Sequence, residues 1–498
     1  MKTALLLALL TTVRLGGNTP PPPIPLTGNV PHPYVSHFEN VLGTSMELKV
    51  TASTDKAYSQ AENAVLAEIA RLSHILSGYD PASEFGRWEQ TYNQPIPVSR
   101  ELFEVLDLFD RWRQRTDGAL DASAEVVTQA WKRAAAAGRP PTAAELSAAV
   151  EEVRQVHWTL DRDKQTATHL SRTPLMLNSF AKSYIIRHAA MAALANPDVH
   201  GIVVNIGGDL VVAGDVHETV DISDPRADAE NDTPMGVLTV HDRAVATSGN
   251  YRRGEMIGGR WYSHIVDPRT GQPADDILSA TVVAPGATDA GALATAFNVM
   301  KVSESVRLAA SIPGVDYLII TRDGRRVESP GWKTLEVKTA PAAAPGDFEV
   351  LVSLEINLQK ESFVKRPYVA VWVEDENHAP VRTISLWHGA DRYLPELKSW
   401  YLKYHGLYAA DQRFNASLTS ATRSAGKYTV KWDGRDDQGN VVKPGKYIIK
   451  IEAAREHGTY QLMRQEIACD DTPKEISIPG NVEIATASLD YRKKTNGQ

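Results

Sequence analysis

One short segment of the chain, residues 262–271, concentrates side chains that could do proton-transfer chemistry. It contains His264, and an imidazole can take up a proton near neutral pH. Asp267 stands before Pro-Arg-Thr-Gly, where proline fixes φ and glycine adopts conformations that other residues avoid. A second polar, glycine-containing segment lies upstream at residues 247–251. Two such clusters at strand-to-loop transitions indicate a ligand site rather than a core.

Further candidate segments precede and follow this pair. Tyr79, in an Asp-Pro turn, could stack on a planar ligand, or it could be a half-buried tyrosine that ends a helix. Asp121 and Ser123 stand at a helix start, where they could cap free N–H groups or leave those groups to an anion. Lys182 is placed either for a phosphate or as a surface lysine. The paired glycines of residues 205–209 could let the backbone approach a ligand closely, or they could form only a tight hairpin.

Length and composition restrict the class of protein. A chain of 498 residues is too long for one ordinary core and predicts two or three domains. The net charge of −8 argues against a nucleic-acid partner, which would require a basic face. Cys469 is the only cysteine, so the chain can form neither an internal disulfide nor a zinc–thiolate site.

The N-terminus, residues 1–34, is interpreted as a leader and tether. Lys2 precedes the apolar run at residues 4–10, which resembles the core of a secretory signal, but Arg14 interrupts the pattern and a cytosolic leader remains the alternative. Residues 18–34 are rich in proline and predict an extended tether. No apolar run reaches the roughly 18 residues that a membrane span requires.

Hydrophobic patterning predicts two structured regions separated by an Ala- and Pro-rich linker at residues 339–346. Residues 35–338 mix helices and strands without strict alternation, which indicates a layered α+β domain. The expected strands are 46–50, 201–212 (with a Gly-Gly turn), 237–245, 280–283 and 317–321. The expected helices are 56–76, 101–115, 143–156 and 291–300.

Residues 347–498 show a different pattern, of short strands at regular spacing, which predicts an all-β sandwich. The expected strands are 348–356, 368–373, 382–387, 427–432, 446–453 and 460–467. Residues 432–440 contain an Asp cluster that could bind calcium, although a solvated hairpin is favoured.

Taken in order, the motifs resemble those of the ApbE family of FAD:protein FMN transferases over residues 41–335. The matching motifs are Gly43-Thr44, Ser77-x-Tyr79-x-x-x-Ser83-Glu84, Leu120-Asp121-x-Ser123 before Trp131, Ala181-Lys182-Ser183-Tyr184, Asn205-x-Gly-Gly-Asp209, Thr247-Ser-Gly-x-Tyr251, His264-x-x-Asp-Pro-x-Thr-Gly271 and Gly291-Ala-Leu-Ala-Thr295-Ala. The C-terminal region resembles an uncharacterised, mostly extracytoplasmic β domain that is sometimes fused behind such transferases.

The resemblance implies a specific reaction. FAD and Mg²⁺ bind, a Thr or Ser hydroxyl of an acceptor protein attacks the phosphorus nearer riboflavin, and AMP leaves. His264 would be the general base. The residues implied to contact FAD are Leu42, Tyr79, Ala119, Leu120, Asp121, Lys182 and Ile265. The residues implied to hold Mg²⁺ are Ser179, through its carbonyl, Thr295 and, as a substitute carboxylate, Asp289.

The chain departs from the family pattern near the expected metal. Gly291 stands where the family has its metal-binding Asp, and Ser183 stands where the family has a glycine. Met176 and Arg187 each replace a family Asp. Asp289 is six residues before Thr295, about 240° apart on a helix, so the two side chains would not share a helix face.

These departures keep three functions open. The first is FMN transfer to an exported redox flavoprotein that is associated with a membrane. The others are an FAD-binding scaffold without transfer activity and a hydrolase that splits FAD into FMN and AMP. The resemblance favours a periplasmic or other extracytoplasmic location, with the cytoplasm as the alternative, and it leaves a homodimer open.

Overall fold

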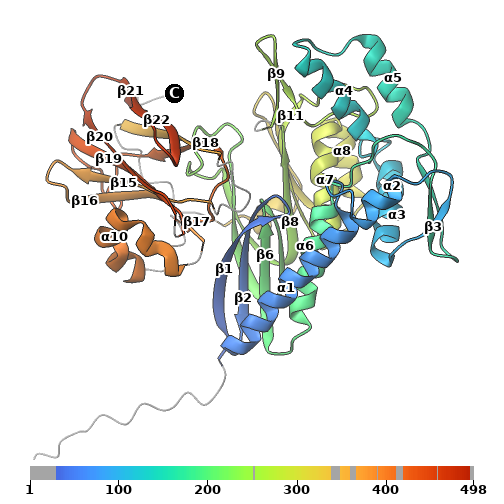
Figure 1. Cartoon of the computed structure of the whole chain (residues 1–498), viewed down its shortest axis with the longest axis horizontal. Coiled ribbons are helices and arrows are strands. Elements are labelled where there is room, and N and C mark those ends of the chain that lie inside the picture. Colours follow the sequence, from blue (N-terminus) through green and yellow to red (C-terminus); the bar gives the residue numbers. More distant parts are fainter. Residues whose placement is uncertain are drawn as a thin grey trace, which may run out of the picture.

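The computed structural model describes residues 30–250, 253–337, 348–358, 366–389, 391–410, 419–456 and 458–493. The leader up to residue 29 and the linker at 339–346 lie outside the described residues. The described chain forms a mixed α+β part and a strand-rich C-terminal part, drawn at the right and left of Figure 1. Within the described residues, no helix is both long and apolar enough to cross a membrane.

The N-terminal part is built on one antiparallel eight-stranded sheet. In spatial order its strands are β1 (His32–Val41), β2 (Thr44–Ala52), β6 (Val199–Ile206), β7 (Asp209–Ile222), β8 (Gly236–Gly249), β11 (Ile277–Ala284), β12 (Asp316–Thr321) and β13 (Arg326–Glu328). Alternate residues along a strand point to opposite faces of the sheet, and here each face packs against its own core. Ile202 and Val204 join the larger core, and Val203 joins the smaller core on the other face.

Strand β1 corrects one sequence expectation. Residues 32–34, expected in the tether, pair with β2, with His32 opposite Ala52 and Pro33 opposite Thr51. Proline lacks a backbone donor and is tolerated here because β1 lies at the edge of the sheet.

Three helices cover one face of the sheet: α1 (Asp55–Leu76), α6 (Ala181–Leu194) and α7 (Ala287–Val299). In α1 the buried residues recur every three or four positions, from Ala57 to Leu76, which gives one apolar stripe facing the core. Thr54 caps this helix by accepting a hydrogen bond from the backbone N–H of Ala57 at 3.1 Å. The helix predicted at residues 56–76 is therefore confirmed.

The remaining elements of the N-terminal part pack around this layered core, and Trp332 joins the smaller core on the other face of the sheet. The helices are α2 (Glu84–Glu89), α3 (Arg100–Arg115), α4 (Ala124–Ala136), α5 (Ala143–Val153), α8 (Val302–Ala310) and α9 (Trp332–Leu335). The short strands are β3 (Pro95–Pro97), β4 (Trp158–Asp161), β5 (Thr166–His169), β9 (Gly254–Ile257) and β10 (Arg260–Ser263).

The C-terminal part is a sandwich of two sheets whose inner faces form a common core. One sheet contains, in order, β18 (Gly426–Trp432), β14 (Phe348–Ile356), β22 (Ile484–Lys493) and β21 (Lys474–Pro479). The other contains β17 (Thr419–Ser420), β16 (Pro380–Trp387), β15 (Tyr368–Asp375), β19 (Gly445–Ala454) and β20 (Tyr460–Cys469). The predicted sandwich is confirmed. In the expected hairpin at 432–440, Asp436 accepts hydrogen bonds from the backbone of Gln438 and Asn440 at 3.0 and 2.8 Å.

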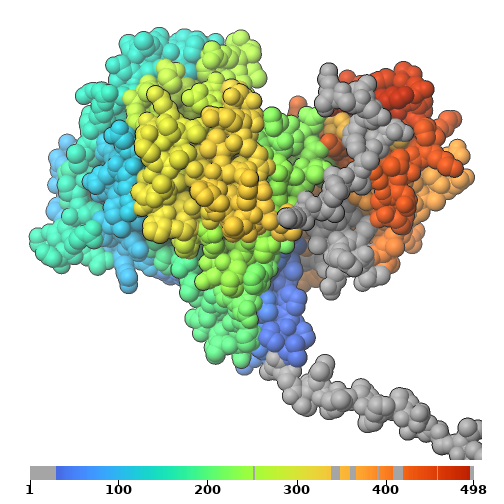
Figure 2. Space-filling model, turned by 180° about the vertical axis from the view of Figure 1, so that it is seen from behind, coloured from blue at the N-terminus to red at the C-terminus, as the bar shows by residue number. Residues whose placement is uncertain are grey.

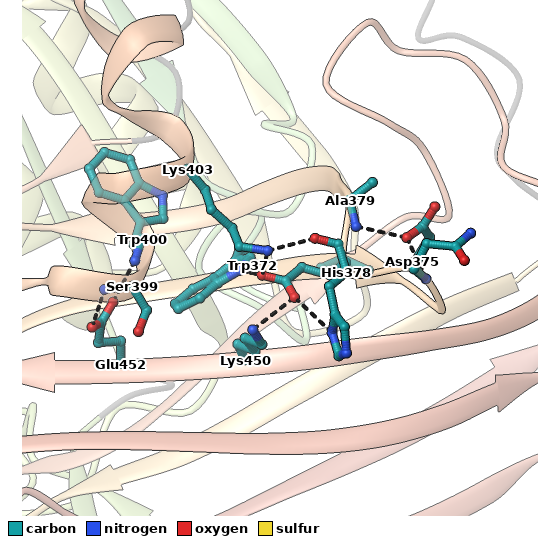
Figure 3. A network of polar contacts seen from close by, with 12 residues as sticks. Trp372, Asp375, His378, Ala379, Ser399, Trp400, Lys403, Lys450 and Glu452 are labelled. Carbon is teal, nitrogen blue, oxygen red and sulfur yellow. Dashed lines mark hydrogen bonds and ion pairs between the residues drawn. The ribbon is translucent and has the colours of Figure 1, made fainter.

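Sequence patterning did not predict the helix that covers the second sheet. A 3₁₀ turn (Asp391–Glu396) leads into α10 (Lys398–Ala410), whose Trp400 and Tyr404 pack on Trp372 and its neighbours. Buried Glu374 holds the helix to the sheet by pairing with Lys403 at 2.9 Å and Lys450 at 2.8 Å (Figure 3). Although burial opposes ionisation, the bonds from Lys450, Trp372 and Lys403 keep the pKa of Glu374 below its usual value.

Candidate active site

Most of the sequence-predicted residues meet around one open cavity of about 420 Å³ in the N-terminal part. This volume lies in the range of small-molecule sites. The predicted residues on its wall are Tyr79, Ala119, Leu120, Asp121, Ser179, Lys182, His264, Ile265 and Thr295. Leu42 and Asp289 are not among the lining residues. Leu42 lies in the turn between β1 and β2, with a φ of 50°, and packs against the main core.

The local fold fixes which nitrogen of His264 is free. His264 follows the hairpin of β9 and β10, and its Nδ1 lies 3.0 Å from the carbonyl oxygen of Arg253. A carbonyl only accepts, so Nδ1 carries the proton and Nε2 of the neutral ring keeps its lone pair. Partial burial, and then the positive charges of Arg253 and Lys132, lower the pKa of His264. The ring is therefore suited to act as a base near neutral pH.

The turn after His264 is held as the sequence suggested. The backbone carbonyl of Asp267 accepts from the N–H of Gly271 at 2.8 Å, and its carboxylate accepts from the guanidinium of Arg269. Gly271 has a φ of 73°, a conformation that favours glycine. The indole of Trp131 on α4 donates to the carbonyl of Gly271 at 2.8 Å, which ties this turn to a helix that also lines the cavity.

A lysine–aspartate pair contributes to the floor of the cavity. Lys182, in the first turn of α6, lies 3.0 Å from Asp209 at the start of β7. The hydroxyl of Ser183 donates to the same carboxylate at 3.3 Å. Burial raises the pKa of Asp209, while Lys182 and Ser183 favour its ionised form. Lys182 thus projects a positive charge into the cavity from a fixed position.

The side chain of Asp121 is buried and engaged in contacts, whereas that of Tyr79 is exposed. Asp121 is buried; its carboxylate accepts from the backbone and hydroxyl of Ser123 at 2.8 and 2.7 Å and pairs with Arg113 at 2.8 Å. It therefore holds the loop rather than capping α4 through the helix N–H groups. Tyr79 is 76% exposed, which excludes the half-buried alternative, and its hydroxyl contacts the amide of Asn178 at 2.6 Å.

The oxygens expected to hold Mg²⁺ form an incomplete set. The hydroxyl of Thr295 lies 3.2 Å from the carbonyl oxygen of Ser179, so these two donors are adjacent. Asp289 belongs to the first turn of α7, away from the lining, as the helical geometry predicted. Among the described residues, no group of three or more His, Cys, Asp or Glu could hold a metal ion. Mg²⁺ prefers carboxylate oxygen, so these residues alone do not fit it.

Comparison with known proteins agrees with this arrangement. The sequence model of the ApbE family matches residues 42–319. The chain belongs to the ApbE family. It is 28% identical over 312 residues to a FAD:protein FMN transferase of Haemophilus influenzae, covering 58% of this chain and 87% of that protein. A relative of the same name from Treponema pallidum is 28% identical over 317 residues, covering 59% and 87%.

Solved structures share the ApbE fold. The ApbE protein of Thermotoga maritima superposes with a TM-score of 0.55 at 25% identity, covering 62% of this chain and all of that one. Residues 349–486 match a second model, described as "Predicted periplasmic protein (DUF2271)". The C-terminal sandwich is therefore similar to that domain over most of its length.

Two departures from the ApbE pattern are neighbours in space. A Cβ atom built on Gly291 would lie 2.3 Å from the hydroxyl oxygen of Ser183 and 3.1 Å from its Cβ. The serine on α6 thus fills the space that a side chain on α7 would enter. Any larger residue at 291 requires Ser183 to move or to be smaller, so the two departures form a complementary pair.

Several cavity residues were not singled out from the sequence. Glu125, Thr128 and Lys132 line it from one face of α4, and Arg253 lines it beside His264. The first three recur at intervals of three and four residues, the spacing of one helix face, so a helical projection of α4 could have found them. Arg253 carries no such signal, because it belongs to no helix or strand with a repeating pattern.

Proposed function

We propose that this chain transfers FMN from FAD to a Thr or Ser hydroxyl of an acceptor flavoprotein and releases AMP. The observation that carries the proposal is His264, whose Nδ1 is occupied by a backbone carbonyl and whose ring lines the cavity beside Lys182 and Arg253. The FMN transferases among the relatives, and the membership of the chain in the ApbE family, support the same reaction.

In this reaction Nε2 of His264 takes the proton of the acceptor hydroxyl as its oxygen attacks the phosphorus nearer riboflavin. A new P–O bond forms between the acceptor oxygen and the phosphorus nearer riboflavin, the bond between that phosphorus and the bridging oxygen breaks, and AMP carries away the bridging oxygen. No oxidation or reduction occurs. Phosphoryl-type transfer depends mainly on positioning and charge neutralisation.

Positive side chains supply that neutralisation. Lys182, Arg253 and Lys132 all line the cavity, and Lys182 is held in place by Asp209. Fixed charges aimed at a developing negative charge lower the barrier most effectively. We assign the flavin to the wall formed by Ala119, Leu120 and Ile265, with Tyr79 free to stack at the mouth.

Magnesium has no complete protein site in this proposal. Thr295 and the carbonyl of Ser179 are adjacent oxygens, but Gly291 offers no carboxylate and Asp289 lies outside the lining. No step of the proposed reaction requires the metal. Assays with and without Mg²⁺ test whether the ion increases the rate of transfer.

The C-terminal match supports a periplasmic or other extracytoplasmic location. The proposed acceptor is an exported redox flavoprotein associated with a membrane, and we expect no nucleic-acid partner. Residues 35–338 would form the transferase domain and residues 347–498 the sandwich domain; a homodimer is an arrangement that sedimentation would test.

The test is the intact mass of an unmodified flavin-acceptor domain after incubation with the full chain and FAD, with and without Mg²⁺. A gain of one FMN together with release of AMP supports transfer. AMP release without a gain in mass would replace transfer with hydrolysis. FAD binding with neither product would support the second candidate, an FAD-binding scaffold. The lack of a carboxylate at Gly291 is the observation that favours this candidate.

A further inference from the structure

A second hollow of about 410 Å³ opens on another side of His264. It shares five residues with the first cavity, namely Lys182, Thr247, Ser248, Arg253 and His264. Its other walls are the turn at Gly207 and Gly208 and the end of β7, residues 220–223. His264 therefore stands between two spaces, and a donor in the first leaves the second open to another molecule.

The end of β7 continues into a segment that contacts the C-terminal domain. Residues 223–235 connect β7 to β8 and reach β18, the first strand of the adjacent sheet of the sandwich. The N–H of Glu230 donates to the carbonyl of Thr429 at 2.9 Å. The side-chain amide of Asn231 donates to the carbonyl of Lys431 at 2.9 Å and accepts from its N–H at 2.7 Å. The segment thus occupies backbone groups of β18 through one backbone bond from Glu230 and two bonds of the Asn231 side chain.

Ion pairs reinforce this contact. Glu230 pairs with Arg423 at 3.0 Å, and both side chains are less than a quarter exposed. Asp232 pairs with Lys431, and both are about one-sixth exposed. Seen from behind, the green part of the N-terminal domain lies next to the orange and red C-terminal domain (Figure 2). Partly buried pairs are screened less than exposed ones, so the contact should persist in salt.

The C-terminal domain also contacts the part of the chain behind the other wall of the hollow, which is the turn at Gly207 and Gly208. A Cβ on Gly207 would lie 2.8 Å from the side chain of Thr44, so the glycine turn rests against the start of β2. Just before that point, at the end of β1, the carboxylate of Glu39 accepts from Thr422 and from the N–H of Arg366. The guanidinium of Arg366 also donates to Asn40 at 2.6 Å.

We propose that the C-terminal domain fixes the walls of this second hollow, and that the hollow receives the acceptor's polypeptide segment that carries the reactive hydroxyl. The inference rests on the proposed function, because it assigns the second substrate of the same His264. The hollow is lined by polar and some apolar side chains and by backbone at Gly207, Gly208 and Gly249, which suits an extended peptide. The C-terminal domain then acts on acceptor recognition and leaves FAD binding alone.

The test compares charge variants of the full chain with an unmodified flavin-acceptor domain. Arg423→Glu places two acidic side chains together at the contact with Glu230 and should raise KM for the acceptor by about tenfold, the size expected for losing one partly buried charged contact. The dissociation constant for FAD should stay within about twofold. The double variant Glu230→Arg/Arg423→Glu restores the pair and should recover most of the loss.

Arg464→Glu is the matched control, since Arg464 is exposed on β20 and makes no ion pair among those described. It should leave both constants unchanged. An unchanged acceptor KM in Arg423→Glu, or an equal loss of FAD affinity, would overturn the inference.

Failure of the proposed function gives a different result. If the wild-type chain transfers no FMN to the acceptor, the acceptor assignment falls with it. The claim that the C-terminal domain fixes the wall of the hollow is then tested by hydrogen exchange of the amides at residues 220–223. Exchange should become faster in Arg423→Glu and recover in the double variant. Unchanged exchange would overturn the claim that the C-terminal domain holds this wall.

Discussion

The two sides of the candidate active site have departed from the family pattern to different degrees. Around His264, the turn at Asp267 and Gly271 and the bond to Arg253 form a complete network. Across the cavity, between α6 and α7, Ser183 and Gly291 replace the expected glycine and carboxylate. The side around His264 is held by backbone hydrogen bonds and a glycine at positive φ, whereas the other side depends on two neighbouring side-chain positions.

The largest expected effect is on the side that kept its network. His264→Ala should slow FMN transfer by about 10²- to 10⁴-fold, the usual contribution of a general base, with FAD affinity unchanged. The measurement is the initial rate of mass gain of the acceptor domain. His74→Ala, on the exposed face of α1, is the control. A similar loss in the control, or full activity in His264→Ala, would remove the distinction between the two sides.

The second effect probes the side that changed. Gly291→Asp alone should destabilise the fold by about 1–3 kcal/mol, because its Cβ would overlap the hydroxyl of Ser183. Ser183→Gly in the same chain should relieve most of that loss and give the cavity a carboxylate. Urea unfolding reports the coupling, and calorimetry reports Mg²⁺ affinity, which should be higher in the double variant. Additive effects on stability would show that the two departures are unrelated.

The smallest effect is on the pH dependence. A base must be neutral to accept a proton, so transfer should fall as the pH drops through the lowered pKa of His264. Lys132→Met removes one positive charge that lowers this pKa, so the acid limb of kcat should move to higher pH by a fraction of a unit. Arg133→Met, the neighbouring residue on α4 outside the lining, is the control at saturating FAD. A limb that moves equally in both variants would indicate a general charge effect.

Local sequence signals predicted most of the fold. Apolar residues spaced by three and four positions predicted α1, and alternation predicted the main strands, because both patterns report a buried face directly. Strand β1 was missed since Pro31 and Pro33 read as a tether, although an edge strand tolerates them. Helix α10 was missed because its contact with Glu374 joins residues distant in sequence.

The sequence predicted the residues of the candidate site that belong to short local motifs. His264, Lys182 and Thr295 line the cavity, and each lies in a short segment with its own turn or helix. Leu42 and Asp289 lie outside the lining. No single-sequence pattern relates Ser183 to Gly291, since their contact depends on how α6 packs on α7.

The pairing of Glu230 and Asn231 with β18 has a consequence for handling the protein. It occupies backbone groups at the outer side of an edge strand, the feature of a sheet most prone to recruit another chain. A sandwich domain expressed by itself would present that edge to solvent and should tend to self-associate or aggregate. Attempts to produce the domain separately should therefore supply residues 223–235, which cover this edge in the full chain.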